Sequence, residues 1–321
     1  MRIEISECIA NDSDAHQWLD RILHKISDGW YLWDTSELDF SAFETTTWVQ
    51  HRGTKGDDIR ELLRKSIKRG AWGFGLHNRR VRVTNRPNYE DEFCPETAAR
   101  FAEKPLCILV ENQFSDGQFV KRIVDELCEP LSILWARPGD PIQIYGVGGG
   151  GQMPDVVKEK MEGKPYRPRL VAIADSDKTG PSADMNVVAQ KLRATCEEHN
   201  VPYWILAKRA SENYLPRTLL MAWKPNSLEH VRKVEAWSRL SEEQKDYYNL
   251  KNGLQVDNQN PLFRGMSQAD HEALFNGFGR TREKVSECWK LKYGETSVEP
   301  KLRERSRGDL ERGIDLICKE V

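Results

Sequence analysis

Short apolar runs alternate with amphipathic stretches between residues 105 and 222. An apolar run of about four to eight residues is typical of a strand buried on both faces, whereas apolar residues at helical spacing indicate an amphipathic helix. The predicted strands are 106–110 (LCILV), 142–147 (IQIYGV), 170–174 (LVAIA) and 203–209 (YWILAKR). The predicted helices between them are 115–129, 154–162 and 184–199. This alternation predicts an α/β fold whose parallel sheet is flanked by helices.

The two flanking regions show a different pattern. In residues 1–104, helices are predicted near 14–27 and 57–69, and we expect a short hairpin around 72–84. The C-terminal flank is predicted to be mostly helical, with helices at 227–239, from Ser241 onward with Gln244 completing a capping box, and at 309–320. We therefore expect three parts: an α-rich N-terminal region (1–104), the parallel sheet (105–222) and a helical C-terminal extension (223–321).

Composition and charge narrow the class of protein. The 321 residues include 48 basic and 50 acidic side chains, so the net charge is only −2 and any nucleic-acid-binding surface must be local. No apolar run approaches the ~18 residues of a membrane span, and the first residues do not resemble a signal peptide. Seven scattered cysteines without a C-x-x-C pair favour reduced thiols. We expect a cytoplasmic protein with no membrane partner.

Acidic residues follow three of the four predicted strands. Glu111 follows the first strand, Asp175 and Asp177 follow the third, and Glu212 follows the fourth; Asp116 begins the first helix. For the aspartate pair alone a turn is the favoured interpretation, since Asp and Ser are common turn residues. Ligands, however, gather at the carboxyl ends of parallel strands, and acids converging there repel one another unless divalent cations neutralise them. Oxygen ligands favour Mg²⁺ or Mn²⁺ over zinc.

The order of these motifs resembles the Toprim domain. The resemblance rests on VE…SDGQF, a glycine-rich turn after the second strand, ADSD and SENYLP, and it covers residues 105–222. Within that group the chain is most similar to the Toprim nucleases of the OLD (overcoming lysogenization defect) type and related phage-defence effectors. The resemblance implies that Glu111, Asp175 and Asp177 are the metal-binding catalytic acids. It implies also that Asp116 and Glu212 are ligands of a second metal.

The match departs from the family pattern at three places. Asn112 stands where the family usually has Gly, Asp116 lies one residue farther from the strand-end glutamate, and Thr179 replaces a third acid after ADSD. The last departure points away from topoisomerases and primases. Farther along, DYYNLKNGL (246–254) resembles a segment that carries a lysine in these nucleases, which implies that Lys251 stabilises charge on the phosphorane or leaving oxygen. An exposed lysine before a helix-ending Asn-Gly is the alternative.

The resemblance implies a nuclease that hydrolyses phosphodiester bonds of DNA or RNA, tRNA included, as the effector of an antiviral defence system. Two Mg²⁺ or Mn²⁺ ions ~3.5–4 Å apart activate water and stabilise the leaving oxygen, so no side-chain nucleophile is required. Because the chain has no Walker motif, we expect by family analogy that a separate ATPase or sensor protein is its partner. The sequence leaves open whether the protein forms a homo-oligomer. The alternatives are an inactive nucleic-acid-binding or partner-docking module and a phosphoacceptor domain.

One basic stretch outside the predicted sheet stands out. Residues 51–83 contain ten lysines or arginines against three acids, together with Trp72 and Phe74. Basic residues interleaved with aromatics are typical of a track for a nucleic-acid backbone. The predicted nucleic-acid-binding residues are Arg60, Arg64 and Lys68 on one helical face, opposite Ile59, Leu62, Leu63 and Ile67, and a second cluster with Arg79 and Arg80. The alternative is a solvated amphipathic helix beside core aromatics.

Overall fold

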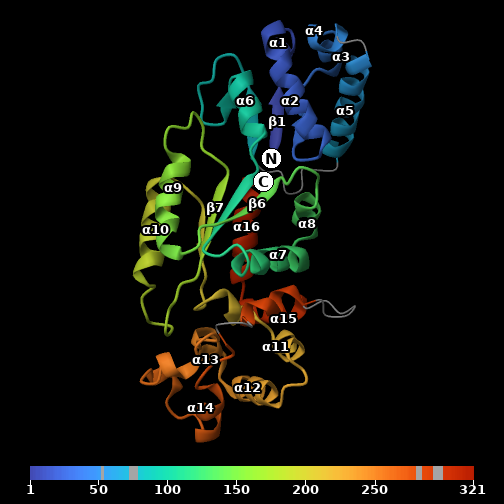
Figure 1. Cartoon of the computed structure of the whole chain (residues 1–321). Coiled ribbons are helices and arrows are strands. Elements are labelled where there is room, and N and C mark those ends of the chain that lie inside the picture. The colour runs from blue at the N-terminus through green and yellow to red at the C-terminus, as the bar shows by residue number, and fades with distance from the viewer. Residues whose placement is uncertain (52–53, 72–78, 280–283, 292–298) are drawn as a thin grey trace.

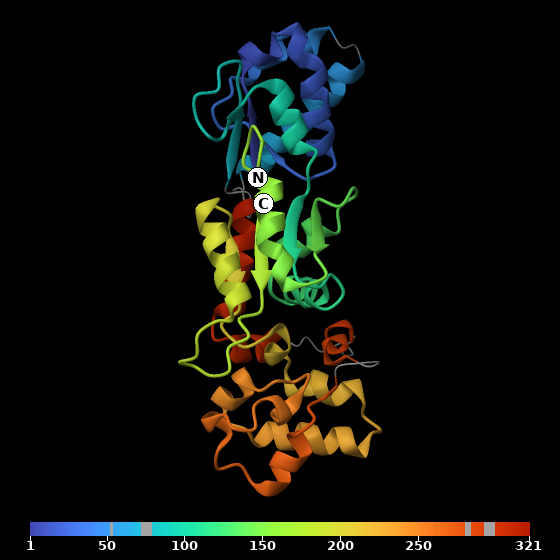
Figure 2. The same cartoon turned by 60° about the vertical axis from the view of Figure 1, so that its left-hand side comes forward.

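The molecule is elongated, with three parts stacked one above the other (Figure 1, Figure 2). The computed structural model describes residues 1–51, 54–71, 79–279, 284–291 and 299–321. Residues 1–104 form one end, a second sheet lies in the middle, and most of the C-terminal helices form the other end. The first and last residues lie close together between the first two parts.

The N-terminal part contains a four-stranded parallel sheet, so the prediction of a merely α-rich region was incomplete. Its strands, in the order β2-β1-β3-β4, are β1 (Arg2–Ile5), β2 (Leu32–Asp34), β3 (Arg80–Val83) and β4 (Glu92–Phe93). β3 pairs in parallel with β1 and β4, which contradicts the predicted hairpin; residues 72–78 of that hairpin lie outside the described residues. Strands of two to four residues are too short to be recognised by alternation alone.

Helices surround this first sheet and bury it in a core of its own. They are α1 (Glu7–Ala10), α2 (His16–Ser27), α3 (Phe40–Glu44), α4 (Thr47–Gln50), α5 (Thr54–Ala71) and α6 (Pro95–Ala102), with a 3₁₀ turn η1 (Ser13–Ala15). The helices predicted near 14–27 and 57–69 are confirmed as α2 and α5. All fully buried residues of this core come from residues 1–102, and Trp33, Phe43 and Trp48 pack against one another within it.

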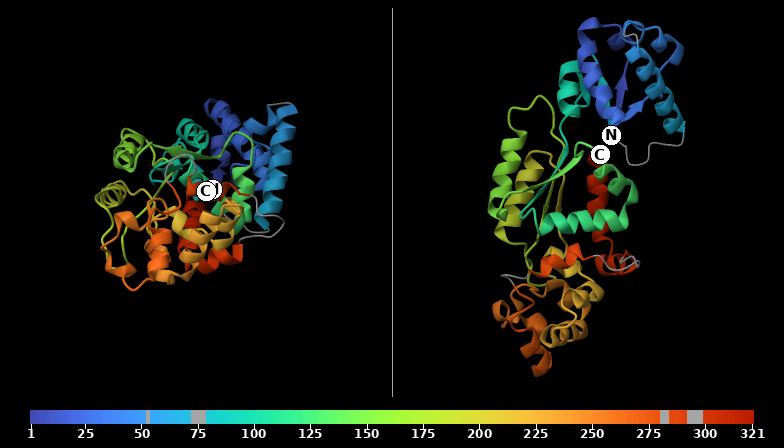
Figure 3. Two further views of the ribbon diagram at one scale, coloured as in Figure 1. Left: turned by 60° about the horizontal axis from the view of Figure 1, so that its bottom comes forward. Right: turned by 45° about the vertical axis from the view of Figure 1, so that its right-hand side comes forward.

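The second sheet confirms that there are four strands in the middle of the chain, although the last one ends at Ile205 and not at residue 209 as predicted. In the order β6-β5-β7-β8, all parallel, they are β5 (Leu106–Val110), β6 (Ile142–Gly146), β7 (Leu170–Ala174) and β8 (Tyr203–Ile205). Helices α9 (Met153–Met161) and α10 (Val187–Glu198) cover one face, and α7 (Asp116–Leu127) and α8 (Glu129–Trp135) lie on the other (Figure 3). The predicted α/β fold is therefore correct for this part.

The C-terminal part is helical, as predicted. It contains α11 (Arg217–Trp223), α12 (Leu228–Arg239), α13 (Glu242–Tyr247), α14 (Gln268–Leu274), α15 (Glu299–Ser306) and α16 (Asp309–Glu320). Short 3₁₀ segments elsewhere are η2 (Gly150–Gln152), η3 (Ser211–Tyr214), η4 (Gly253–Val256), η5 (Pro261–Phe263) and η6 (Val285–Lys290). The predicted capping box is present at α13: Gln244 N donates to Ser241 Oγ at 3.1 Å, and Ser241 N donates to Gln244 Oε1 at 2.9 Å.

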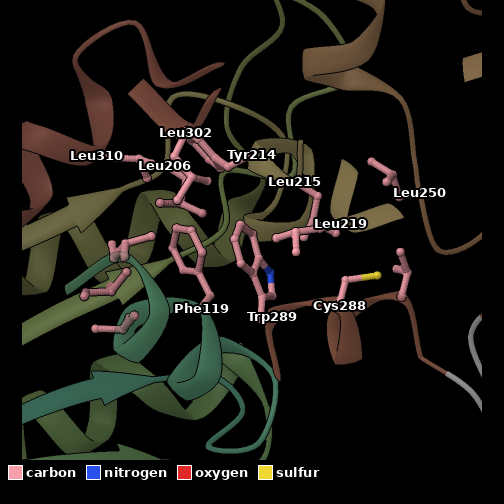
Figure 4. Packing of buried hydrophobic residues seen from close by; sticks show 14 of the residues in the cluster. Phe119, Leu206, Tyr214, Leu215, Leu219, Leu250, Cys288, Trp289, Leu302 and Leu310 are labelled. Carbon is pink, nitrogen blue, oxygen red and sulfur yellow. The ribbon is translucent and has the colours of Figure 1, made fainter. Parts of the chain in front are cut away.

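One apolar core joins the second sheet to the C-terminal part. It contains buried residues of β5, β7 and α7 together with residues from α12, α15 and α16. Trp289 of η6 packs against Phe119 of α7 with ring centroids 5.2 Å apart, and Figure 4 shows Leu215 and Leu219 beyond the indole. α16 runs back along the sheet and contacts β7 and β8. The last helix thus completes the sheet face opposite α9 and α10.

Candidate functional site

A cavity of about 250 Å³ opens at the carboxyl ends of β5 and β7. Glu111, Asp116, Asp175 and Lys251 line it, and we call it the acid cavity. The acids meet there because β5 and β7 are adjacent parallel strands, so the residues that follow them lie at one edge of the sheet. Four of the residues predicted as catalytic or metal-binding therefore surround one space.

The opposite wall of the acid cavity comes from the C-terminal part, which the sequence did not predict. Its lining residues are Gly279, Lys284, Val285 and Ser286. The side chain of Lys284 is exposed, whereas Val285 and Ser286 are buried. These residues follow the last predicted acid by about seventy positions and carry no local motif. Lys284, Val285 and Ser286 reach the cavity because η6 packs against α7 in the shared apolar core.

The loop between β5 and α7 holds the Asp116 carboxylate by local hydrogen bonds. Asn112 N donates to Asp116 Oδ2 at 2.8 Å, and Ser115 Oγ donates to Asp116 Oδ1 at 3.1 Å. Ser115 is the N-cap residue of α7, but its side chain accepts no hydrogen bond from the helix backbone. Burial raises the pKa of Asp116 to about 6; the Asn112 hydrogen bond lowers it, and the negative charge of Glu212 raises it.

Asp175 stands at the end of β7 in contact with the start of η3. Its Oδ1 accepts a hydrogen bond of 2.9 Å from Ser211 N. Burial raises the pKa of Asp175 well above its ordinary value; the positive charge of Lys251 opposes this, and the charges of Asp116 and Glu212 add to it. The carboxylates are therefore close enough to repel one another, as the sequence predicted for acids at this edge.

Glu212 lies behind the cavity wall and is almost completely buried, with 1% of its surface exposed. Apart from the Lys251 ammonium, its carboxylate has no hydrogen-bond partner among the described residues. Lys251 Nζ lies 3.1 Å from Glu212 Oε1, so the lysine supplies the balancing charge. Burial lowers the pKa of Lys251, but the charges of Glu212 and Asp175 outweigh it and raise the pKa overall. The structure thus places Lys251 at the acids, as the resemblance implied.

Glu111 is exposed and reaches over the glycine-rich turn that follows β6. Its Oε2 lies 3.0 Å from the position that a Cβ atom would take at Gly150, so a side chain there would press on the carboxylate. The backbone of the turn is tied to the same residue, since Gly148 N donates to Glu111 O at 3.0 Å. One role of this glycine run is therefore to leave room for the Glu111 side chain.

Asp177 does not line the acid cavity. Its side chain is exposed and accepts a hydrogen bond from Asn186 Nδ2, while Asn186 Oδ1 caps α10 by accepting from Ala189 N at 2.7 Å. Its backbone has φ 50°, in the left-handed region. Of the predicted i, i+2 pair, Asp175 lines the cavity and Asp177 contacts the N-cap of α10, while the charge of Asp177 still raises the pKa of Asp175.

The ligand atoms around the acid cavity are of the type that binds a divalent cation, but the carboxylates lie too far apart to share one ion. Carboxylate oxygens are the ligands that Mg²⁺ and Mn²⁺ prefer, and Lys251 is the one partner of the buried Glu212 carboxylate among the described residues. Among the described residues, however, no three His, Cys, Asp or Glu side chains converge closely enough to hold one ion. A bound cation would need Glu111, which is exposed, to turn toward Asp175 and Asp116.

The predicted basic face on α5 is partly available. Arg64 is 62% exposed and lies 3.5 Å from Glu44, Arg60 pairs with Asp57 at 2.8 Å, and Lys68 is exposed. On the opposite side Ile59 and Leu63 are buried as predicted and Leu62 is partly buried, but Ile67 is 40% exposed, contrary to the prediction. Trp72 and Phe74 lie outside the described residues. On α5, Arg64 and Lys68 are therefore the exposed members of the predicted basic face, and Arg60 is partly buried in its ion pair.

Arg79 and Arg80 are engaged in ion pairs, so the second basic cluster is not a free surface. The side chain of Arg79 is 9% exposed and pairs with Asp91 at 2.9 Å and Glu320 at 3.4 Å. Arg80 lies on β3 and pairs with acids of the neighbouring strand β1 and of the segment around β2, at 2.9–3.2 Å: Glu4, Asp34 and Glu37. These arginines stabilise the first sheet.

No helix in the described part of the chain is both long and apolar enough to cross a membrane. All seven cysteine thiols are free. Comparison with known protein families, with curated proteins and with solved structures finds no match to this chain.

Proposed function

We propose that this protein is a divalent-metal-dependent phosphodiester hydrolase that acts on nucleic acid, as a Toprim-type nuclease. The observation that carries the proposal is the acid cavity, where Glu111, Asp116, Asp175 and Lys251 meet at the carboxyl edge of a parallel sheet. A set of acids with raised pKa values and one balancing lysine is the charge arrangement of a cation-dependent phosphate site. The sequence resemblance to the Toprim domain supports the same class.

Each residue has a distinct task under this proposal. Asp175 and Asp116 are held by backbone hydrogen bonds and would present fixed carboxylate oxygens, while Glu111 can turn in from the exposed rim. Divalent cations bound there would supply an activated water and charge stabilisation of the leaving oxygen. Lys251, with its side chain 40% exposed, can donate to a phosphate oxygen at the cavity mouth while it neutralises Glu212.

An inactive nucleic-acid-binding or partner-docking module is the second candidate. The observation that favours it is the spacing of the acids, of which no three converge on a single ion among the described residues. Such a module would use the same cavity without hydrolysis, so activity and binding must be measured separately.

The test combines cleavage with binding. Supercoiled plasmid, linear DNA and tRNA are incubated with the protein in Mg²⁺, Mn²⁺ or EDTA, and binding of the same substrates is followed by fluorescence anisotropy. We expect cleavage in Mg²⁺ or Mn²⁺ only, and a loss of at least about 10²-fold in Asp175→Asn and Glu111→Gln, because metal stabilisation is worth several kcal/mol. Glu198→Gln, an exposed acid at the far end of α10, is the matched control. Unchanged cleavage in both site variants would exclude the acid cavity as the active site.

The biological setting is proposed from the sequence resemblance. The protein would be the effector of an antiviral defence system and would work with a separate ATPase or sensor protein. Co-purification of the protein from its native host, with mass spectrometry of what is retained, tests this. If no nucleotide-hydrolysing protein co-purifies from phage-infected cells, the proposed defence role is contradicted. The hydrolase proposal is unaffected by that result.

A further inference from the structure

A second and larger cavity, of about 500 Å³, lies at the seam between the N-terminal part and the second sheet. We call it the seam cavity. Its floor is one row of side chains on neighbouring strands: Gln143 on β6, Cys107 on β5 and Leu170 on β7 are register partners. These residues lie near the amino ends of the strands, whereas the acid cavity lies at the carboxyl ends. The two cavities therefore occupy opposite edges of one sheet.

Basic side chains surround the seam cavity on two sides. Lys160 belongs to α9, Lys164 to the segment between α9 and β7, and Lys104 to the segment that joins the two sheets. Among the described residues, no carboxylate lies within ion-pair distance of these three lysines, and Glu159 is the one acid among the lining residues. Arg169 also lines the cavity, but it already donates to Tyr31 Oη at 2.7 Å and to Glu320 O at 3.1 Å.

The three lysines place positive charge around one cavity, and an anion of charge −2 or more would be attracted to it. Phosphate oxygens are suitable acceptors for lysine donors.

Aromatic rings complete the lining. Tyr166 is fixed against Phe101, with ring centroids 5.2 Å apart, and both line the cavity. Tyr145 follows Gln143 by two residues on β6, so it lies on the same face of the sheet; it is 45% exposed, and Lys160 Nζ lies 4.2 Å from its ring centroid. An exposed tyrosine ring beside a polar amide can stack a planar base whose edge the Gln143 side chain can bond.

We propose that the seam cavity binds a free nucleoside phosphate. The aromatic rings and Gln143 would hold the base, and Lys104, Lys160 and Lys164 would hold the phosphates. The volume of about 500 Å³ lies in the usual range for small-molecule sites, roughly 300–1,000 Å³. This site is separate from the proposed hydrolase site and does not depend on it.

The first experiment measures binding by calorimetry with the full chain in EDTA, where unshielded acids keep phosphates out of the acid cavity. The probes are ATP, AMP, adenosine and inorganic phosphate. We expect ATP to bind about tenfold or more tightly than either adenosine or phosphate, because it combines ring stacking with charge. Phosphate that binds as tightly as ATP would overturn the proposal, as would the absence of ATP binding.

Variants locate the site. Lys160→Gln/Lys164→Gln and Tyr145→Ala should each weaken ATP binding about tenfold or more. Lys158→Gln removes the same charge from an exposed position of α9 and is the matched control, while Asp175→Asn tests the acid cavity. Binding that depends on Asp175 but not on Lys160 and Lys164 would contradict the assignment to the seam cavity.

Alkylation of Cys107 gives a readout that is specific to the seam cavity, because this thiol belongs to its lining. Burial raises the pKa of the Cys107 thiol, so the reaction with iodoacetamide is run at about pH 8.5 and mapped by peptide mass spectrometry. ATP should slow labelling of Cys107 and leave Cys8, an exposed thiol in the N-terminal part, unchanged. Equal labelling of Cys107 with and without saturating ATP would overturn the proposal. A 5′-phosphorylated oligonucleotide that protects Cys107 at lower concentration than ATP would show a strand-end site instead of a free-nucleotide site.

Discussion

Glu212 and Lys251 form the charge pair on which the acid cavity depends. The glutamate is buried, and the lysine Nζ, 3.1 Å from its Oε1, is its one partner among the described residues. Lys251→Met should therefore lower the free energy of unfolding by roughly 1–3 kcal/mol, because the buried carboxylate loses its partner. Glu212→Gln in the same chain should restore part of the loss. Urea unfolding at pH 7 measures both.

Lys284→Met is the matched control for that comparison, since Lys284 lines the same cavity from an exposed position. Its effect on stability should stay within about 0.5 kcal/mol. Wild-type stability in Lys251→Met would show that the buried carboxylate does not need the lysine.

Asp116 gives a pH dependence whose sign follows from its raised pKa. The pKa is about 6 in the folded chain and ~3.9 in an unfolded one, so between these values the folded chain holds more protons. The contribution of this group to stability therefore falls as pH rises from about 4 to about 6, and it stays low above that. Asp116→Asn removes the titration, so its stability relative to wild type should increase over this interval. Urea unfolding at a series of pH values in EDTA measures the difference.

Asp315→Asn, an exposed aspartate on α16, controls for the loss of one negative charge in the Asp116 experiment. A stability difference between Asp116→Asn and wild type that does not change with pH would mean that burial does not raise the pKa of Asp116.

The sequence predicted the position of those site residues that directly follow a strand of the second sheet. Glu111 and Asp175 follow adjacent parallel strands, so chain order alone places them at one edge. Asp177 lies elsewhere because the i, i+2 rule holds for extended backbone and the chain has already turned into the left-handed region at this residue. Ser286 was not predicted, because its place depends on packing between segments far apart in the sequence.

At the scale of elements, the strands of the second sheet, three of which have five residues, were predictable and the shorter strands of the first sheet were not. β3 has the sequence RVRV, whose valines are buried and whose arginines alternate with them. When the strands that pair with β3 are not known, its two arginines are easily taken for part of a basic surface cluster. Parallel pairing with β1 sets Arg82 opposite Glu4, and the two side chains bond at 2.9 Å. The positive charge of this second basic cluster is therefore balanced by acids of the neighbouring strands, whereas the basic residues of α5 lie outside the sheet.

In α16, replacing Gly313 by Ala should destabilise the protein, although helix propensity alone favours Ala. Gly313 lies inside this helix, where Ala would normally be preferred. A methyl group at Gly313 would overlap the indole ring of Trp204 on β8, so Gly313→Ala should lower the free energy of unfolding by roughly 1–3 kcal/mol. Asp315→Ala, two residues along on the exposed face, is the matched control. A stabilised Gly313→Ala protein, measured by urea unfolding, would mean that α16 does not pack this closely on the sheet.

At the scale of the whole molecule, Glu320 ties the first part to the second. Its carboxylate pairs with Arg79 of the N-terminal part at 3.4 Å and with Arg167 of the second at 2.6 Å, and its side chain is 6% exposed. Glu320→Ala would leave these arginines without that partner, and we expect a loss of roughly 3 kcal/mol. The first part should then unfold separately, giving two calorimetric transitions, whereas Lys319→Ala, at an exposed neighbouring position, should keep the wild-type profile. A single unchanged transition in Glu320→Ala would show that other contacts couple the two parts.

The position of α16 has a consequence for the order of events during translation. The N-terminal core draws its fully buried residues from 1–102 and can form as soon as they leave the ribosome. β8 ends at Ile205, yet the helix that covers it begins only at Asp309. A nascent chain must leave the part of the sheet that α16 contacts uncovered until that helix has been made, and Lys251 and Ser286 reach the acid cavity late as well. The acid cavity therefore cannot be complete before Ser286, more than eighty residues beyond β8, has been synthesised.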